Sequence, residues 1–313
     1  MTTVTNPILL DSTGLRMATA LESIAAQPAS YVTIGTTQTV TGQKTFSVDP
    51  KGHNGQMFFP VPNSAEAHNC FYRGENLLGS GHFASLAALS EAVQAGNFSD
   101  IFVGDYIEQS VTVSGTAYNA VWRVAGINYF ANVGDTQPAS NHLVMVPDGI
   151  IGSAVMNDTN TTAGGFLGSK MWTTTLPLYV TGIRNAFGSS HVLKHRRLLS
   201  STMNADLTSM SIPGWKGAVT WDGWSWTDVY VCLMTNTMAI GRSGTASSAR
   251  DEIDTTGQLP LFRLANNKIS CRSAWWLSAV AGSTIFSLVH AGGDTGAGAA
   301  SDSPGVRPYF LFA

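Results

Sequence analysis

The sequence predicts an α+β fold in which short strands outnumber helices, and three observations support this prediction. First, IFVGDYI (101–107), AVWRVAGINYF (120–130) and HLVMVP (142–147) are short, β-branched or aromatic runs bounded by Gly, Asn, Asp or Pro. Second, helical periodicity is confined to a few segments, of which 85–95 is the clearest. Third, 44% of the 313 residues are hydrophobic, with 8 Trp and 14 Phe, which is enough material for a large core.

Residues 1–60 predict an attachment and oligomerisation region made of a helix and strands. Residues 11–13 can cap a helix in which Leu21 and Ile24 belong to one apolar stripe. Thr- and Val-rich strand material follows at 31–48. Such a helix cannot bury its stripe alone, so it packs either on its own domain or on copies of itself. We expect the second arrangement, in a homotrimer.

Residues 61–97 predict a connecting segment with one helix, and residues 98–313 predict the main C-terminal domain. The helix is expected at 85–95, since Leu86 begins an apolar spacing that continues to Val93 and a glycine follows it.

Within the C-terminal domain, residues 101–130 predict a hairpin and DVYVCLM (228–234) predicts a further strand. Further helices are predicted at 170–188, where a Leu-Pro pair marks a start or a break, and at 191–200.

Charge and composition exclude several classes of protein. Charged residues make up 12% of the chain, against roughly 25% in a typical globular protein, and the net charge is −3. No basic stripe is present to neutralise phosphates, so we expect no nucleic-acid partner. No apolar run approaches the roughly 18 residues that a membrane span needs, and the N-terminus lacks the pattern of a signal peptide. We therefore expect synthesis in a host cytoplasm without export.

The three cysteines, Cys70, Cys232 and Cys271, are an odd number at wide spacing, which predicts buried free thiols rather than disulfides. A catalytic role for Cys232 and Cys271 is the weaker interpretation, because neither has a recognisable partner motif. His191 and His195 stand four residues apart, yet no third ligand accompanies them. We expect no metal site there.

Two further patterns have both a functional and a structural interpretation. The Trp cluster at 215–226 could stack on sugars, but such density is more typical of core packing. Asp294 and Asp302 are two isolated carboxylates, which make a poor calcium cage. The chain also lacks a GxSxG elbow and a phosphate-binding loop. We therefore expect no enzyme activity, no cofactor and no metal.

The region from 98 to 313 resembles a family of C-terminal domains of phage tail and bacterial surface proteins, and a Gly-Gln-Lys-Thr-Phe phrase at 42–46 resembles tail-fibre segments. Seven markers stand in the family's order. They are FVGDYI (102–107), VWRVAGIN (121–128), HLVMVP (142–147), WTTTLPLY (172–179), LPLF (259–262), AWWLS (274–278) and GVRPYF (305–310). The resemblance implies a C-type-lectin-like fold, related to that of formylglycine-generating enzymes, with a small twisted sheet, flanking helices and long loops.

The segment 275–313 resembles the variable region of target proteins of diversity-generating retroelements, in which adenines of the gene are mutated. In this resemblance a frame is retained, while the positions between frame residues vary. The frame residues are Trp275, Trp276, Phe286, Gly293, Gly305 and Arg307. The implied variable, ligand-binding positions are Ala281, Gly282, Ile285, Leu288, His290, Ala291, Gly292, Asp294, Gly296, Ala297, Gly298, Ala299, Asp302 and Pro304. Variable positions must tolerate many residues, so we expect them to be exposed, and Arg307 to be buried with carbonyl or carboxylate partners.

The composition of 278–304 agrees with this resemblance. Randomising the adenines of an AAC or AAT codon cannot produce Lys, Glu, Gln, Met or Trp, and the segment contains none of the five. A Gly- and Ala-rich loop in a chain already poor in Lys, Glu and Gln gives the same result by chance.

The expected function is a receptor-binding adhesin at a phage tail tip, contacting a host-cell receptor, either protein or glycan, and other tail proteins. A structural tail or baseplate component, or a bacterial surface adhesin of the same fold, is the alternative.

Overall fold

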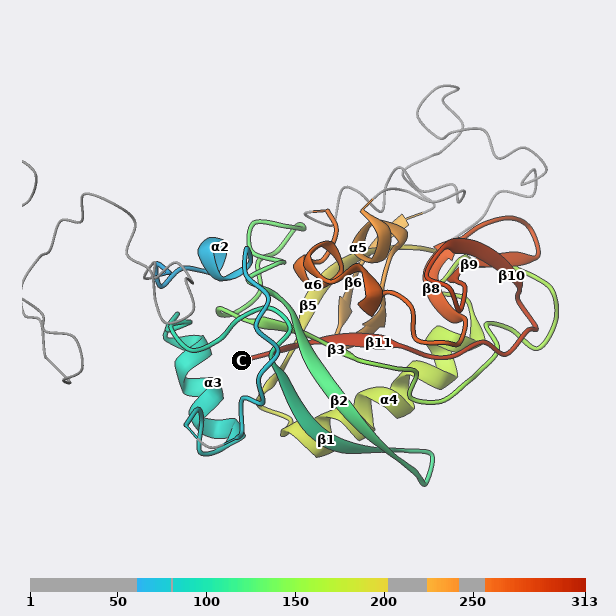
Figure 1. Cartoon of the computed structure of the whole chain (residues 1–313). Coiled ribbons are helices and arrows are strands. Elements are labelled where there is room, and N and C mark those ends of the chain that lie inside the picture. Colours follow the sequence, from blue (N-terminus) through green and yellow to red (C-terminus); the bar gives the residue numbers. More distant parts are fainter. Residues whose placement is uncertain (1–60, 80, 202–223, 242–256) are drawn as a thin grey trace, which may run out of the picture. The chain divides into compact units, whose positions relative to one another are not determined.

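The computed structural model describes residues 61–79, 81–201, 224–241 and 257–313. Residues from Val61 to Ala313 belong to one compact unit (Figure 1). The helix and strands predicted within 1–60 lie outside the described residues, as do Trp215 and Trp221 of the Trp cluster.

The unit is of mixed helix and sheet, and all strand pairings in its sheets are antiparallel, which agrees with the α+β prediction. The main sheet has the order β1-β2-β3-β11-β4, with β7 also paired to β11. Its strands are β1 (Tyr106–Val113), β2 (Thr116–Ile127), β3 (Leu143–Pro147), β4 (Val192–Leu193), β7 (Val231–Leu233) and β11 (Pro308–Phe312). The C-terminal strand therefore lies inside the sheet, between strands from the middle of the chain.

The predicted hairpin is confirmed in β1 and β2, although the strand begins at Tyr106 and not at residue 101. Ser114 and Gly115 connect the two strands, and both have positive φ, +49° and +82°. A two-residue turn of this kind matches the right-handed twist of the paired strands.

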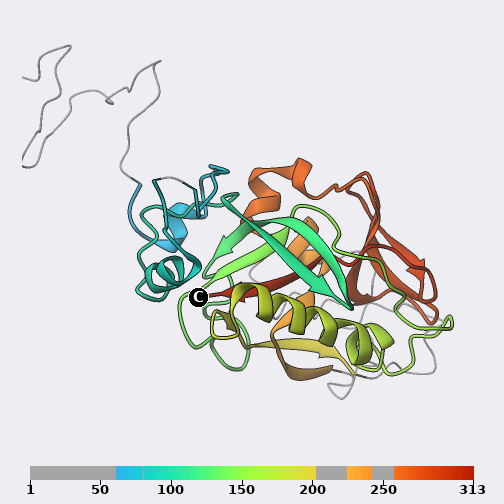
Figure 2. The same cartoon turned by 90° about the horizontal axis from the view of Figure 1, so that it is seen from below.

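Two predicted helices are confirmed. Helix α3 (Leu86–Gln94) begins at Ser85, whose side chain accepts a hydrogen bond from Ala88 N. Helix α4 (Leu176–Phe187) follows a π-helical turn, η4 (Met171–Thr175), and lies against β1 (Figure 2). The close approach needs Gly182, since a Cβ there would stand 2.3 Å from Thr112 O. The short helices are α2 (Ala65–His68), α5 (Asn236–Ile240), α6 (Pro260–Leu264) and the 3₁₀ turn η6 (Asn266–Lys268).

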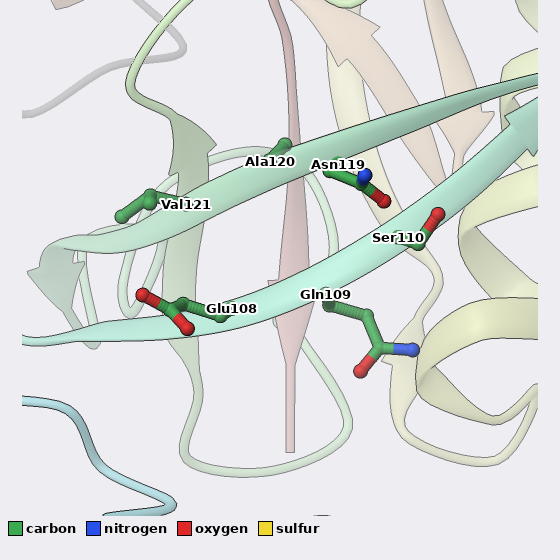
Figure 3. A pocket seen from close by; sticks show the side chains of 6 residues that line it. All are labelled: Glu108, Gln109, Ser110, Asn119, Ala120 and Val121. Atoms are coloured by element: carbon green, nitrogen blue, oxygen red, sulfur yellow. The ribbon is translucent and has the colours of Figure 1, made fainter.

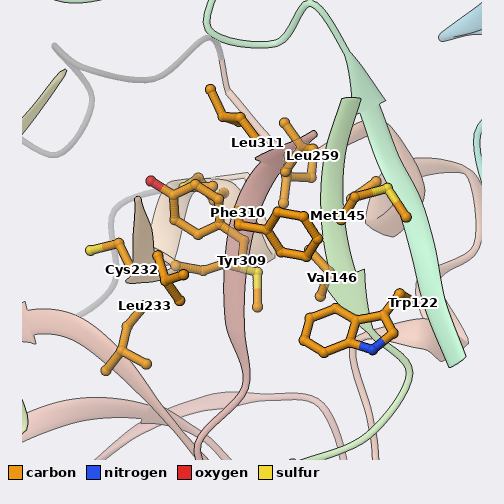
Figure 4. Packing of buried hydrophobic residues seen from close by; sticks show 14 of the residues in the cluster. Trp122, Met145, Val146, Cys232, Leu233, Leu259, Tyr309, Phe310 and Leu311 are labelled. Carbon is orange, nitrogen blue, oxygen red and sulfur yellow. The ribbon is translucent and has the colours of Figure 1, made fainter. Parts of the chain in front are cut away.

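The core joins the main sheet to α4 through aromatic contacts. Figure 4 shows the part of this core around Trp122 and Phe310. The Trp122 ring of β2 meets Phe310 of β11 and Phe187 of α4 edge-on, at centroid distances of 5.4 and 5.5 Å. All three side chains are almost fully buried. Edge-to-face packing of this kind stabilises beyond burial alone, so this aromatic cluster anchors β11 to α4.

The prediction of a helix at 191–200 is wrong. This segment forms β4 and then β5 (His195–Ser200), which pairs with β6 (Trp224–Val229) along its whole length. Pairing with a distant strand outweighs a local pattern that is compatible with both structures. The predicted strand 228–234 is divided at Tyr230 between β6 and β7, which belong to different sheets.

Residues 61–97 are not a separate connection, because Leu77, Leu89 and Val93 are fully buried in the same core. The Asp105 carboxylate, also fully buried, joins this segment to the start of β1. It accepts hydrogen bonds from the Arg73 guanidinium and from the backbone N–H groups of Gly74, Glu75 and Phe102.

The three cysteines are thiols and not disulfides, as predicted, but only Cys232 of the three is buried. Cys70 is exposed just after α2, and Cys271 is half-buried just before β8. The expectation of three buried thiols is therefore wrong for Cys70 and Cys271, since both lie in loops at the surface of the unit.

Candidate binding face

The segment predicted to vary forms a three-stranded antiparallel sheet at one end of the unit, and α2 lies at the other end (Figures 1 and 2). Its order is β10-β9-β8, from β8 (Trp275–Val280), β9 (Ile285–Val289) and β10 (Thr295–Ala299). Among the described strands, β10 pairs only with β9 and is an edge strand. We call the residues of this sheet and its two connecting turns the binding face.

The frame residues hold this sheet against the core. Trp275, Trp276 and Phe286 are fully buried. Both indole N–H groups have acceptors, because Trp275 Nε1 donates to Ile269 O at 3.3 Å and Trp276 Nε1 to Ala154 O at 2.8 Å. Large side chains with their polar atoms satisfied are suited to a fixed support.

Gly305 lets two backbones approach closely beneath the face. Its N–H donates to Ala274 O at 2.8 Å, and its carbonyl accepts from Trp276 N at 3.0 Å. A Cβ at position 305 would stand 2.2 Å from Ile150 Cγ2 and 2.8 Å from Ile150 Cβ, so any side chain must displace Ile150.

Arg307 is fully buried, and the expectation that it donates to carbonyl groups is confirmed. Its guanidinium donates to Pro147 O at 2.9 Å, Ile269 O at 3.0 Å and Lys268 O at 2.9 Å. The Trp275 ring lies 5.1 Å from its central carbon. Burial lowers the pKa of Arg307 to about 10, so the group stays cationic at neutral pH. One side chain thus joins two separate stretches of backbone, at Pro147 and at Lys268 with Ile269, under the face.

The predicted variable positions fall into three groups by exposure. Six are exposed and present their atoms to solvent. These are His290, Ala291, Gly292, Asp294, Ala297 and Asp302. Five are partly buried, and these are Gly282, Ile285, Gly296, Ala299 and Pro304.

The expectation of exposure is wrong at Ala281, Leu288 and Gly298, which are buried. Gly298 lies against the support, because a Cβ there would stand 2.8 Å from Leu288 Cδ2 and 3.1 Å from the Trp276 ring. Strand residues alternate between two faces, so a contiguous variable segment on strands must place some positions toward the core.

The turn between β9 and β10 is closed by backbone hydrogen bonds. His290 N donates to Asp294 O at 2.8 Å, and Gly293 N donates to His290 O at 2.9 Å. Gly293, at φ +99°, holds the turn as a frame residue should. The His290 ring lies over Gly296, where a Cβ would come within 2.1 Å of its Nε2. Glycine at 296 therefore leaves the space that the His290 ring, the one large side chain in this turn, occupies.

A loop from the middle of the chain supports the face, and the sequence offered no signal for it. Thr162 Oγ1 donates to Gly282 O at 2.8 Å, and Ser301 Oγ donates to Asn160 Oδ1 at 2.7 Å. These partners are separated by 120 and 141 positions in the chain. No local pattern marks contacts over such distances.

The other candidate residues have structural partners. His191 Nδ1 lies 2.9 Å from Ser90 Oγ, and His195 Nε2 lies 3.0 Å from Tyr309 Oη. Trp224 and Trp226 are half-buried on β6. Among residues 61–79, 81–201, 224–241 and 257–313, no three His, Cys, Asp or Glu side chains gather closely enough to hold a metal ion.

A depression of about 390 Å³ lies on the β1–β2 ribbon, outside the binding face (Figure 3). Three cross-strand pairs line it, namely Glu108 with Val121, Gln109 with Ala120 and Ser110 with Asn119. Within the described ranges, no helix combines the length and the apolar character that crossing a bilayer requires.

A comparison of the chain with protein-family models, curated proteins and solved structures finds no match.

Proposed function

We propose that the chain is a receptor-binding protein of a phage tail, in which a C-type-lectin-like domain displays a diversified surface for host attachment. The family markers support this proposal, because they coincide with elements that build the unit. VWRVAGIN lies in β2 except for its last residue, and HLVMVP includes β3. AWWLS includes most of β8, and GVRPYF leads into β11.

The observation that carries the proposal is the division of residues 275–313 into a buried frame and exposed positions between its members. Trp276, Phe286 and Arg307 are fully buried, whereas His290, Asp294 and their neighbours in the turn are exposed. Exposed positions away from special backbone features tolerate substitution at little cost in stability. A gene segment with this division can change its surface without losing its fold.

The present face favours weak attachment at each copy. Its exposed side chains are mostly small, and it lacks the buried aromatic or arginine anchors that dominate tight interfaces. Several copies acting together would supply the missing affinity. A homotrimer is therefore part of the proposal, and light scattering at micromolar concentration tests it, since a monomer would remove that part.

The test of diversification is the DNA sequence around the gene. We expect a near-copy of the segment encoding 275–313 and a neighbouring reverse-transcriptase gene. The copy should differ from the gene only at adenines, and the altered codons should include exposed positions such as His290 and Asp294. Codons for the buried Leu288 and Gly298 should be spared.

If no copy is found, residues 278–304 are an ordinary Gly- and Ala-rich segment, and a structural role in the tail or baseplate becomes the better proposal. Differences concentrated on Trp276, Phe286 or Arg307 would also contradict the proposal, because those residues support the fold.

A further inference from the structure

The sheet formed by β8, β9 and β10 offers a ligand its edge, because both faces of its two inner strands are covered. Every residue of β8 and four of the five residues of β9 are buried. On one face lie Trp276 and Phe286, and on the other Asn236 of α5 donates to Ser287 Oγ at 3.4 Å. In β10 only Gly298 is buried. The parts of the sheet that a ligand can reach are therefore β10 and the turns (Figure 1).

Strand β10 presents main chain more than side chains. Its sequence is Thr-Gly-Ala-Gly-Ala, so two positions have no side chain and two have a single methyl group. The polar atoms along most of this strand are thus main-chain N–H and C=O groups. Mutation of the gene changes side chains and leaves these groups in place, except where it introduces proline. The edge of β10 is therefore a constant element within a segment that we propose to vary.

The ladder with β9 determines which main-chain groups of β10 point outward. Asp294 O and Ala300 N, at the two ends of the strand, hydrogen-bond toward the residues that flank β9, at 2.8 and 2.9 Å. The pairing between the two strands runs without a bulge. Because consecutive residues point their main-chain groups to opposite edges, Thr295, Ala297 and Ala299 face the outer edge.

The fold closes this outer edge at one end and leaves the rest open. Ala299 N donates to Asp302 Oδ2, and Ala299 O accepts from Asp302 N, both at 2.9 Å. An added strand can therefore pair at Thr295 and Ala297 but not beyond them. Native proteins usually protect an exposed edge with a charged side chain, a proline or a bulge, and β10 contains none of these.

Strand β1, which is the edge of the main sheet, is protected in these ways. Its first residue, Tyr106, donates to Glu75 O and accepts from Leu77 N, both at 2.8 Å. Near its other end, the Thr112 carbonyl lies so close to α4 that a Cβ at position 182 would stand 2.3 Å from it. An exposed charged residue, Glu108, lies between these two closures. The contrast indicates that the open edge of β10 serves for binding.

The spacing of the outer groups selects the class of partner. Residues two apart in a strand are about 6.8 Å apart, and each offers one donor and one acceptor. Another extended polypeptide has the same repeat with donors and acceptors to match. Building on the attachment function proposed above, we propose that an extended segment of a receptor protein pairs with the outer edge of β10 at Thr295 and Ala297. In such strand addition the main chain supplies affinity and neighbouring side chains supply specificity.

A proline at position 297 tests the pairing. The N–H of Ala297 points away from β9, so Ala297→Pro removes an outer donor and leaves the hydrogen bonds to β9 in place. We expect its adsorption to whole host cells to fall by at least about tenfold, which corresponds to the loss of one or two main-chain hydrogen bonds. The matched control is Ala297→Ser, which changes the side chain and keeps the N–H. Its adsorption should change by less than about twofold.

A second variant keeps the test decisive if proline disturbs the fold. Lactic acid in place of Ala297 converts one amide to an ester, so the N–H is lost and the side chain is unchanged. We expect weaker adsorption of this variant too. The same replacement at Ala291, on the exposed turn, is its control and should adsorb as the unaltered chain does. Thermal unfolding of each variant establishes that it is folded.

Treatment of the cells distinguishes the two chemical classes of receptor. Digestion of surface proteins with trypsin should abolish adsorption, whereas periodate oxidation of surface glycans should not. Adsorption that survives trypsin and is lost after periodate overturns the proposal. If Ala297→Pro instead lowers the molar mass measured by light scattering and adsorbs normally, the edge joins copies of the chain and the proposal is wrong.

Failure of the strand pairing can be told apart from failure of the proposed function. If Ala297→Pro and the ester variant adsorb normally while His290→Ala adsorbs weakly, the partner contacts the turn, and strand pairing is wrong while the diversified face stands. If His290→Ala, Asp294→Asn and both variants at position 297 all adsorb as the unaltered chain does, the face is not the site of attachment, and both proposals are wrong.

Discussion

Strands β10 and β11 are both five residues long and are separated by only eight residues, yet their surroundings differ completely. Every residue of β11 is buried, and the strand pairs with β3, β4 and β7. In β10 only Gly298 is buried, and among the described strands β9 is its single partner. The tolerance of substitutions therefore falls sharply between Ala299 and Gly305. One short gene segment encodes both a surface that can change and a buried support that cannot.

Among the residues around β11, Arg307, which directly precedes the strand, should have the largest effect on the free energy of unfolding when it is replaced. Arg307→Met removes the donors of three carbonyl groups, the buried Pro147 O and Ile269 O and the partly buried Lys268 O. We expect the free energy of unfolding to fall by about 3–5 kcal/mol, as for other broken buried polar networks. Urea denaturation measures it, and Arg272→Met, at an exposed arginine, is the control. A loss below about 1 kcal/mol would mean that these carbonyls find water instead.

His142, which lies just before β3, should make the free energy of unfolding depend on acid pH. Its ring accepts a hydrogen bond from Phe130 N at 3.1 Å, and its other nitrogen lies 3.2 Å from Ser140 O. This arrangement requires the neutral ring, and burial lowers the pKa of His142 to about 4, from 6.5. The stabilisation is complete above pH 6.5 and is lost as the pH falls to about 4, and it amounts to about 3 kcal/mol.

The measurement is the free energy of unfolding against pH for the unaltered chain and for His142→Gln. Burial also lowers the pKa of His195 well below its ordinary value, and this group acts in the same direction in both proteins. Because His142 also contributes to the lowered pKa of His195, the difference between the two curves reports His142 together with its effect on His195. Parallel curves between pH 6.5 and 4 would contradict the prediction.

Replacing one glycine beside β11 and one in the β9–β10 turn by alanine should give different losses of stability. Gly305→Ala places a methyl group 2.2 Å from Ile150 Cγ2, whereas Gly292→Ala places one 3.5 Å from Asp294 Oδ1 on the exposed turn. We expect Gly305→Ala to cost about 1–3 kcal/mol, as overpacking does, and Gly292→Ala to stay within about 0.5 kcal/mol. Thermal unfolding of the two variants provides the comparison. Equal losses would show that the turn is as constrained as the support.

The elements outside the binding face are easier to predict from the sequence than the face itself. Ser85 and the apolar spacing after it are local signals for α3, and HLVMVP is a local signal for β3. The segment 191–200 was misassigned because its strand structure depends on pairing with 224–229, which local periodicity does not contain. For Arg307, burial indicated a need for partners, but the partners come from loops 38 to 160 positions away.

Exposure within the face was mispredicted for a related reason. A contiguous run of small residues does not indicate which of them point toward Trp276, because that depends on the register of β9 and β10. The sequence alone therefore predicts the same exposure for Leu288, Gly298 and Ala297, although in the sheet the first two are buried and Ala297 is exposed.

The smallest effects on stability should come from the exposed turn, where any large effect should be on binding. His290→Ala and Asp294→Asn alter side chains in a turn that backbone hydrogen bonds hold, so each should change the free energy of unfolding by less than about 0.5 kcal/mol. Adsorption of the protein to its host cells is the second measurement, because a diversified face predicts weaker adsorption by these variants at unchanged stability. Glu91→Gln, which alters an exposed carboxylate on α3 outside the face, is the control. If only destabilised variants such as Gly305→Ala lose adsorption, attachment takes place elsewhere on the molecule. The face would then be a surface that packs against neighbouring proteins.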